Sequence, residues 1–262
     1  MARTVQQLFN LKGRTALVTG GSRGLGLQMA QALGEAGARV VISARKADEL
    51  AHGAELLRGQ GIDAHWIAAD GLKEADLHQL ADQALQHLGR VDILVNNAGA
   101  SWGAPAEDHP IAGWDKVMNL NVRSYFILSQ HIAKASMIPN KGGRIINTAS
   151  VAGLGGNPPG MKTLAYNTSK GAVITFTQAL ACEWGGHGIT VNAICPGVFP
   201  TKMAAGLLDM LGPTYLEHVP LHRVGDDEDL KGLAVLLASD AGKHITGQWM
   251  AVDGGASALA GG

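Results

Sequence analysis

The sequence predicts a doubly wound α/β fold: a single domain over residues 1–262, with a parallel sheet of about seven strands and helices on both faces. Two observations carry this prediction. Short apolar runs alternate with amphipathic helical segments along the chain, which is the pattern of consecutive βαβ units. Each apolar run is continuous, as expected for parallel strands that are buried on both faces. A length of 262 residues is within the range of one such domain.

The first half of the chain alternates between strands and helices. The run RTALVT reads as a buried strand, and the segment after it places Leu25, Met29 and Leu33 on one helix face. Gly37 then ends that helix. The predicted strands are 14–19, 39–44, 64–69 and 91–99, and the predicted helices are 24–38, 48–57 and 74–88.

The second half continues the same alternation. The segment 198–225 has the weakest helical pattern, because Pro200, Pro213 and Pro220 interrupt it. A loop of this kind beyond the carboxyl end of a strand is a candidate substrate lid. The predicted helices are 114–137, 163–185 and 229–240, and the predicted strands are 143–150, 188–197 and 248–255.

The stretch TGGSRGLG, residues 19–26, follows the first strand directly and opens the first helix. Glycines let the backbone turn sharply and approach a pyrophosphate, while the helix N-terminus supplies N–H donors and a positive dipole. A glycine triplet alone is also a tight turn, but at the first βα unit it indicates a Rossmann-type dinucleotide site. The predicted cofactor-binding residues of this turn are Gly20, Ser22, Arg23, Gly24, Leu25 and Gly26.

The end of the second predicted strand distinguishes the two nicotinamide cofactors. A site selective for NAD places Asp or Glu there, to accept a hydrogen bond from the ribose 2′-hydroxyl. This strand instead ends in Ala44 followed by Arg45, and Arg23 lies in the glycine turn. Guanidinium groups suit a 2′-phosphate, so the sequence predicts NADP(H). The alternative is that Arg45 is a solvated residue at the start of a helix.

A serine, a tyrosine and a lysine follow the predicted strand 143–150. Tyr166 and Lys170 are four residues apart and share one helix face. A free tyrosine has a pKa near ~10, and a neighbouring ammonium favours the phenolate, so we expect Lys170 to lower the pKa of Tyr166. Tyr166 is then a general acid for reduction and a general base for oxidation. Alone, the pair is equally an amphipathic helix with a solvated lysine.

Six motifs follow one another in the chain: TGGSRGLG, NNAG (96–99), NLNV (119–122), Ser150, YNTSK (166–170) and PGVFPT (196–201). Their order and spacing resemble those of short-chain dehydrogenases/reductases over essentially the full length. The resemblance implies NADP(H)-dependent hydride transfer between a nicotinamide and a carbonyl or secondary alcohol. The catalytic residues that it implies are Asn121, Ser150, Tyr166 and Lys170.

The resemblance also assigns individual roles. Ser150 orients the substrate carbonyl, Lys170 contacts the nicotinamide ribose, and Asn121 holds a water of a proton relay. In the family the catalytic asparagine stands about five residues before an aromatic residue on the same helix. Asn121 has this spacing to Phe126, so it is preferred to Asn119. Further cofactor contacts implied are Arg45, Asp70, Gly71, Asn97, Ala98, Gly99, Tyr166, Lys170, Pro196, Gly197, Val198 and Thr201.

The substrate is a small-molecule carbonyl or alcohol whose identity stays open. The chain looks most like bacterial 3-oxoacyl reductases of the rhamnolipid-pathway kind, which implies a 3-oxoacyl substrate and admits an acyl thioester. Gluconate 5-dehydrogenase-like enzymes also look near, so a polyol, sugar acid or alicyclic alcohol is the alternative. Apolar residues at 203–211, such as Met203 and Leu207, favour the acyl substrate. A non-catalytic NADP-binding protein is the remaining alternative, and both Tyr166 and Lys170 argue against it.

The spacing between Ser150 and Tyr166 is unusual. In the family the serine stands about thirteen residues before the tyrosine, whereas here the separation is sixteen. The extra residues fall in a Gly- and Pro-rich segment, GLGGNPPGMKTLA, which suits a loop. Because a strand end and a helix start hold the two side chains, the loop can lengthen at little entropic cost. We expect this enlarged loop to border the substrate and set its selection.

Composition excludes several classes of function. A net charge of -1 gives no electrostatic footprint for nucleic acid or an anionic membrane, and no apolar run reaches membrane-spanning length. Cys182 and Cys195 match no zinc or redox spacing, and the ten histidines form no metal motif, so no metal is expected. We therefore expect a cytoplasmic protein, and the family resemblance implies a homotetramer.

Overall fold

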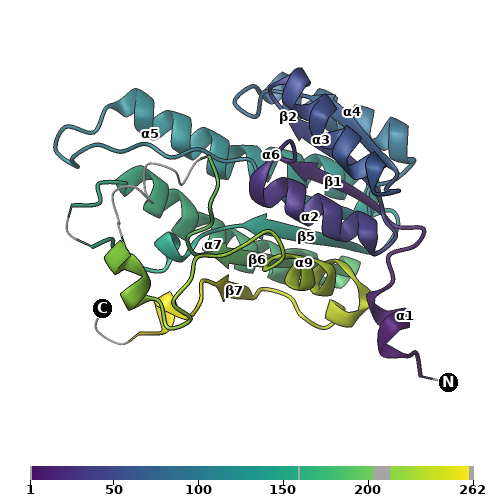
Figure 1. Cartoon of the computed structure of the whole chain (residues 1–262). Coiled ribbons are helices and arrows are strands. Elements are labelled where there is room, and N and C mark those ends of the chain that lie inside the picture. Colours follow the sequence, from purple (N-terminus) through teal and green to yellow (C-terminus); the bar gives the residue numbers. More distant parts are fainter. Residues whose placement is uncertain (1, 159, 203–212, 260–262) are drawn as a thin grey trace.

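A computed structural model describes residues 2–158, 160–202 and 213–259 of the chain. Its centre is one seven-stranded sheet in the order β3-β2-β1-β4-β5-β6-β7, and every neighbouring pair is parallel (Figure 1). The predicted fold class and all seven predicted strands are therefore confirmed. The strands are β1 (Thr15–Thr19), β2 (Arg39–Ala44), β3 (Ala64–Ala68), β4 (Ile93–Asn96), β5 (Gly143–Thr148), β6 (Ile189–Pro196) and β7 (Trp249–Val252).

Helices cover both faces of the sheet. On one face lie α2 (Gly24–Glu35), α3 (Ala47–Gly59) and α9 (Lys231–Ala238), and on the other lie α4 (Glu74–Leu88), α6 (Ser124–Ile132) and α7 (Leu164–Trp184). Along β1, Ala16 and Val18 belong to the core of the first face and Leu17 to that of the second. This division explains why most strands contain consecutive apolar residues rather than an alternation of apolar and polar ones.

The long helix predicted at 114–137 is divided into four pieces. It runs as α5 (Ile111–Met118), the π-helical turn η1 (Asn119–Arg123), α6 and a second π-helical turn η2 (Ala133–Met137). A π turn inserts a residue into the helical repeat and changes the direction of the side chains around it. Helix α5 lies at the left of Figure 1, at the opposite end of the molecule from the N-terminal helix α1 (Val5–Phe9).

Several short elements were not predicted from the sequence. Helix α1 is stabilised by a capping box between Thr4 and Gln7, which the sequence analysis overlooked. The expected lid at 198–225 falls partly outside the described residues, because 203–212 are not described, and with them lie the apolar residues that favoured an acyl substrate. The other short helical elements are η3 (Val151–Gly153), η4 (Gly185–His187), η5 (Pro213–His218), η6 (Asp240–Gly242) and η7 (Ala256–Ala258).

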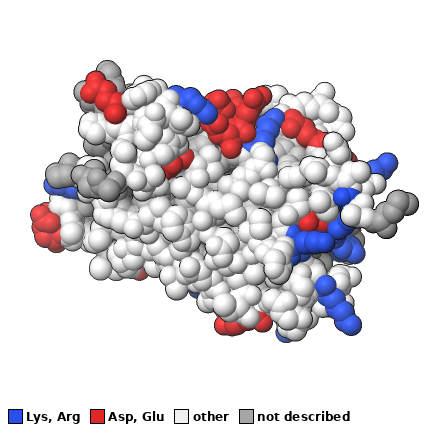
Figure 2. Space-filling view, turned by 90° about the horizontal axis from the view of Figure 1, so that it is seen from below, with Lys and Arg blue, Asp and Glu red and all other residues white. Residues whose placement is uncertain are grey.

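The surface is sparsely charged. The face in Figure 2 is mostly uncharged, and its Lys and Arg side chains gather mainly at the right, the end where the chain begins in Figure 1. Within the part of the chain that the structure describes, no helix has both the length and the apolar character needed to cross a membrane.

Candidate active site

A cleft of about 1820 Å³ opens at the carboxyl ends of the strands. The strand order reverses between β1 and β4, and in a doubly wound sheet a crevice forms at this point. Most residues predicted to bind cofactor or substrate line the cleft, and Gly26, Asp70 and Asn121 do not. Those that line it are Gly20, Ser22, Arg23, Gly24, Leu25, Arg45, Gly71, Asn97, Ala98, Gly99, Ser150, Tyr166, Lys170, Pro196, Gly197, Val198 and Thr201.

The glycine turn after β1 is folded tightly. Gly20 and Gly24 have φ values of +65° and +54°, a region that side-chain-bearing residues rarely adopt. Asn97 follows β4 and donates from Nδ2 to the carbonyl oxygens of Thr19 (3.1 Å) and Gly20 (3.3 Å). A Cβ on Gly26 would lie 2.2 Å from the Gly20 oxygen. Gly26 therefore packs beneath the turn and is not among the lining residues of the cleft, and its part in cofactor binding stays a prediction.

The turn fits the pyrophosphate of a dinucleotide. Helix α2 begins at Gly24, and its N-cap residue Arg23 makes no side-chain capping bond. The N–H groups of the first turn are thus not capped by the Arg23 side chain, and they carry the positive end of the helix dipole. Gly20 and Gly24 present no side chain that would keep a phosphate away. The residues present fit the diphosphate group that the sequence predicts.

Three cations and one carboxylate surround the place expected for the ribose 2′ position. Arg23 pairs with Glu49 at 2.6 Å and Lys46 with the same carboxylate at 3.1 Å. Arg45 is exposed, lines the cleft and makes no ion pair with any described residue. The net charge is positive, which suits a phosphate. Glu49 was not predicted from the sequence because it lies within α3, beyond the end of β2 at which a carboxylate is expected.

Asp70 is not among the lining residues of the cleft. Its Oδ1 accepts from the backbone N–H of Leu72 at 3.1 Å, so the carboxylate closes a turn after β3. The neighbouring Gly71 does line the cleft, and a Cβ there would meet Leu120 at 2.7 Å. The adenine contact at Asp70 stays a prediction.

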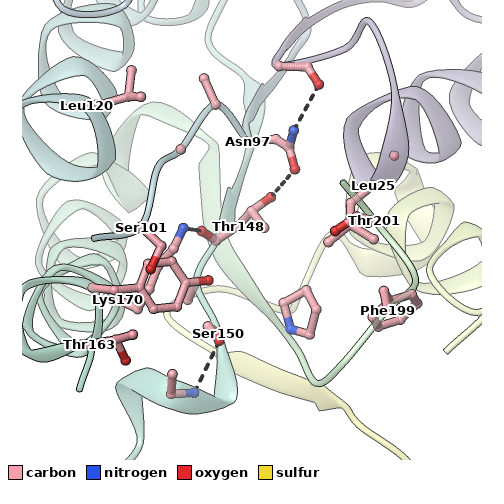
Figure 3. Close-up of a pocket in the computed structure, with 18 of the residues that line it drawn as sticks. Leu25, Asn97, Ser101, Leu120, Thr148, Ser150, Thr163, Lys170, Phe199 and Thr201 are labelled. Atoms are coloured by element: carbon pink, nitrogen blue, oxygen red, sulfur yellow. Dashed lines mark hydrogen bonds between the residues drawn. The ribbon is translucent and has the colours of Figure 1, made fainter. Parts of the chain in front are cut away.

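The expected serine, tyrosine and lysine meet on one wall of the cleft. Ser150 follows β5, and a hydrogen bond joins its side chain to that of Tyr166 in the first turn of α7. Lys170 is buried and donates from Nζ to the Thr148 carbonyl oxygen at 2.7 Å. Its Nζ lies 5.7 Å from the centroid of the Tyr166 ring. Figure 3 shows Ser150 and Lys170 beside the same hollow as Ser101 and Thr163.

The pKa of Tyr166 differs from the sequence-based expectation. We expected the lysine to lower it, but burial raises the pKa of Tyr166 above its ordinary value, while the hydrogen bond with Ser150 acts in the opposite direction. Burial also lowers the pKa of Lys170 to about 8. Both shifts have one physical reason, because a site that excludes water disfavours charge on either group. The uncharged phenol is a proton donor in this state.

The side chain of Asn121 binds the backbone of Ala100 and the side chain of Ser169, the residue before Lys170. It is fully buried in the π turn η1, whereas Asn119 is exposed. Its Oδ1 accepts from Ala100 N at 2.8 Å, and its Nδ2 donates to Ala100 O and to Ser169 Oγ, both at 2.9 Å. The turn thereby places an amide between the segment after β4 and helix α7.

An asparagine cluster holds the enlarged loop 151–163. The Asn167 side chain donates to the carbonyl oxygen of Ala152 at 2.8 Å and to Asn157 Oδ1 at 2.9 Å. Thr163 donates to Asn167 Oδ1 at 2.8 Å and accepts from Asn157 at 2.7 Å. The residue directly after Tyr166 therefore ties together both ends of the loop, and it was not predicted because its partners lie in an irregular loop with no repeating pattern.

The same loop is joined to the segment that follows β4. The N–H of Ala104 donates to the carbonyl oxygen of Lys162 at 2.9 Å. Loop 151–163 and segment 100–105 thus form two connected sides of one opening, and several of their residues line the cleft. The prediction that the enlarged loop borders the substrate region agrees with this position.

Thr148 is a further residue that the sequence analysis missed. Its carbonyl oxygen holds Lys170, and its hydroxyl donates to Asn97 Oδ1 at 3.2 Å (Figure 3). It precedes Ser150 by two residues on an extended segment, so both side chains face one side, and this spacing was the available signal. Other lining residues that were not predicted include Thr19, Ser101, Leu120, Thr163 and Phe199.

Comparison with known proteins agrees with the fold and the site. Residues 14–211 match the model of the short chain dehydrogenase family. The chain is 45% identical to the rhamnolipids biosynthesis 3-oxoacyl-[acyl-carrier-protein] reductase of Pseudomonas aeruginosa, covering 94% of this chain and 97% of that protein.

Two solved structures are similar along almost their whole length. The Pseudomonas aeruginosa RhlG/NADP active-site complex superimposes with a TM-score of 0.88 at 43% identity, covering 96% of this chain and 99% of that one. A gluconate 5-dehydrogenase from Burkholderia cenocepacia in complex with NADP and tartrate gives a TM-score of 0.92 at 34% identity, covering 98% and 100%. Together with the arrangement of Ser150, Tyr166 and Lys170, these matches establish that the chain belongs to the short-chain dehydrogenase/reductase family of oxidoreductases.

Proposed function

We propose that the protein is an NADP(H)-dependent reductase of a 3-oxoacyl-type carbonyl, which also oxidises the corresponding secondary alcohol. The observation that carries this proposal is the meeting of Ser150, Tyr166 and Lys170 in the cleft that holds the glycine turn. A protein that only binds the nucleotide has no need of a buried lysine beside a phenol in that position.

The roles of the side chains follow from their positions. Bound NADPH supplies the hydride to the substrate carbon. Tyr166 donates its phenolic proton to the carbonyl oxygen, and the hydroxyl of Ser150 orients that oxygen. Lys170, as an ammonium, stabilises the phenolate that forms and contacts the nicotinamide ribose. Asn121 positions Ala100 and a water that returns a proton through the lysine.

The preference for NADP(H) rests on charge at the end of β2. Ala44 and Arg45 stand where an NAD-selective site has a carboxylate. Arg45 has no described carboxylate partner, and Arg23 shares Glu49 with Lys46. A 2′-phosphate gives Arg45 the partner it lacks. The two similar structures named above contain NADP, which supports the same choice.

The substrate region combines apolar walls with a few cations. Val151, Leu154 and Met161 of the enlarged loop line it, as does Phe199 after β6, and these residues suit an acyl chain. A sugar acid is the second candidate, because Lys162 and Lys202 also line the cleft and suit a carboxylate. The chain is similar to both a 3-oxoacyl reductase and a gluconate 5-dehydrogenase, which supports the same two candidate substrates, an acyl compound and a sugar acid.

A substrate screen tests the proposal. NADPH oxidation is followed with acetoacetyl-CoA, longer 3-oxoacyl thioesters, 5-ketogluconate and cyclic ketones. We expect the highest kcat/KM with a 3-oxoacyl thioester. A higher kcat/KM with 5-ketogluconate would replace the acyl substrate by the sugar acid, and turnover of none of the compounds would contradict the class of substrate.

We also propose that the chain assembles as a homotetramer in the cytoplasm. Ile111 on α5, Phe126 on α6 and Leu164 on α7 are exposed large apolar side chains. Burying such side chains between subunits removes apolar surface from water. Light scattering of the purified protein tests the assembly, and a monomer would contradict it.

A further inference from the structure

A second, smaller cavity lies at the opposite edge of the sheet from the cleft. It has a volume of about 210 Å³ and is formed at the amino ends of β4, β5 and β6. Four cationic residues line it together with the carboxylate of Asp92. We call it the basic cavity, and its charged lining residues are Arg14, Arg90, Lys141, Arg144 and Asp92.

The charges around the basic cavity do not balance. Asp240, in η6, and Arg3 complete the cluster, so five cations face two carboxylates within the described chain. The net formal charge of this cluster is therefore positive. The Lys and Arg side chains at the right of Figure 2 gather around acidic residues at this end of the molecule. The total charge of the chain is -1, so this positive excess is local.

The two carboxylates already have close partners. Asp92 is buried and accepts from the backbone N–H of Thr15 at 3.0 Å and from Arg90 Nε at 2.7 Å. Asp240 is paired closely with Arg3. Both Arg14 and Arg144 reach Asp240 only at 3.4 Å, which is long for a charge-assisted bond. These two guanidinium groups therefore lack a strong acceptor of their own.

Arg144 has an unsatisfied donor inside the cluster. Its Nε is buried and has no hydrogen-bond partner, although Nη1 donates to the Gly143 carbonyl oxygen at 3.0 Å. An unpaired buried donor costs free energy, and a buried guanidinium needs a compensating anion. Burial lowers the pKa of Arg144, and the charge of Arg14 acts in the same direction, while the carboxylates of Asp240 and Asp92 act in the opposite direction.

The backbone holds Lys141 at the rim of this cavity. Lys141 has a φ of +53°, one of two described non-glycine residues with a positive φ. Gly188 lies against it, and a Cβ on Gly188 would be 2.7 Å from the Lys141 oxygen. This conformation of Lys141 ends the helical segment before it in a Schellman turn, in which the N–H of Gly142 donates to the Met137 carbonyl oxygen at 3.0 Å and the N–H of Lys141 to that of Ile138 at 3.1 Å.

We propose that the basic cavity is a binding site for a phosphate-type oxyanion, separate from the nucleotide cleft. Arg14 and Arg144 supply guanidinium donors that lack a strong acceptor, and Lys141 supplies a further positive charge. A tetrahedral dianion offers several acceptor oxygens and brings the cluster close to neutrality. The ligand is inorganic phosphate or a phosphomonoester group.

Calorimetric titration with inorganic phosphate tests the proposal, at an ionic strength held constant with sodium chloride. We expect saturable binding to the wild-type protein, weakened at least about tenfold in Arg144→Met, because each charge-assisted hydrogen bond contributes on that scale. Lys141 and Arg14 are more exposed than Arg144, so their substitution disturbs the core less. Lys141→Met and Arg14→Met should both bind phosphate more weakly than the wild-type protein. Arg123→Met, on the exposed surface of η1, is the matched control and should bind like wild type.

A further variant locates the binding. If phosphate entered the nucleotide cleft, Arg45→Met would lose the heat of binding and Arg144→Met would keep it, which would overturn the proposal. Absence of binding to the wild-type protein above the chloride control would also overturn it. Circular dichroism of every variant shows whether the fold is retained, and if Arg144→Met does not fold, Lys141→Met and Arg14→Met decide the outcome.

Discussion

The two halves of the cleft are built in different ways. The nucleotide half is formed by the turn 19–26 and the ends of β2 and β4, and its glycines are tightly packed. A Cβ on Gly20 would lie 2.8 Å from the Asn97 side chain, and a Cβ on Gly26 would lie 2.2 Å from a backbone oxygen. The substrate half, formed by loop 151–163 and segment 100–105, is tightly packed only at its base, where a Cβ on Gly153 would lie 2.5 Å from the backbone of Lys170, and is open in its outer part. A Cβ at Gly155 or Gly156 would meet nothing within 4 Å.

This difference in packing separates the residues proposed to carry out the reaction from the loop proposed to select the substrate. Strand register and glycine packing fix the nucleotide half, together with Ser150 at the end of β5 and Lys170 in α7. A change at its glycines or strand ends disturbs the sheet itself, whereas its exposed side chains can be changed without this effect. The loop is instead held at its base by Asn167, so its outer residues can vary without moving the reacting groups.

The protonation state of Lys170, beside Tyr166, should control the rate of reduction. In the free enzyme its pKa is lowered to about 8, so it loses its proton as the pH rises through that value. The kcat/KM for NADPH-dependent reduction should then fall about tenfold per pH unit above pH ~8, because the ammonium is the active form.

The variant Lys170→Met should lose about 10³-fold in kcat/KM at neutral pH and show no such limb. Lys170→Arg is the control that retains the positive charge, and its fall should move to higher pH. A wild-type profile that stays flat to pH 10 would contradict the role of the ammonium.

A pair of alanine substitutions compares the two halves directly. Gly26→Ala forces a methyl group against the Gly20 oxygen and should lower the free energy of unfolding by about 1–3 kcal/mol, with weakened NADPH binding. Gly155→Ala should change the free energy of unfolding by less than about 1 kcal/mol. Urea denaturation of both variants measures the difference, and equal effects would remove the distinction between the two halves.

Arg45 tests the cofactor preference within the nucleotide half. Arg45→Met removes a guanidinium that has no described carboxylate partner, so the fold should be unaffected while the KM for NADPH rises about tenfold or more. The KM for NADH should stay nearly constant, because NADH has no 2′-phosphate. Steady-state kinetics with both cofactors gives the ratio, and an equal change for the two would contradict a phosphate contact.

Asn167 should affect the substrate half alone. Asn167→Ala breaks the ties to Ala152 and Asn157, and the KM for the carbonyl substrate should rise several-fold while the KM for NADPH is unchanged. Thr168→Ala, at the neighbouring exposed position, is the matched control. A parallel rise in the KM for NADPH would mean that the loop and the nucleotide half are not independent.

The parts of the fold that the sequence predicts are those with local causes. Continuous apolar runs predicted every strand of the sheet, and the glycine turn and the pair Tyr166 and Lys170 were recognised from their order and spacing along the chain together with the other motifs. The π turn at Asn121 was not predicted, because no local pattern in the sequence marks it. The contacts of Asn167 with the loop and the position of Glu49 beside Arg23 depend on the path of the folded chain, so they were not predicted either.

The electrostatics of the site also depended on the tertiary structure. The sequence predicted that Lys170 lowers the pKa of Tyr166, whereas burial raises it. The sign depends on how much water the fold removes around the phenol, which no spacing in the sequence reports. The basic cavity was hidden likewise, since Arg14, Arg90 and Arg144 come from three separate segments.

The most direct test of the account is the variant Tyr166→Phe, measured for both turnover and NADPH binding. Removing only the hydroxyl takes away the proton donor and leaves the ring in place, so kcat should fall about 10³-fold or more. NADPH affinity, measured by fluorescence or calorimetric titration, should stay within about twofold of wild type, since the hydroxyl serves the carbonyl oxygen. Turnover close to wild type would contradict the assignment of Tyr166 as the acid, and with it the proposed mechanism.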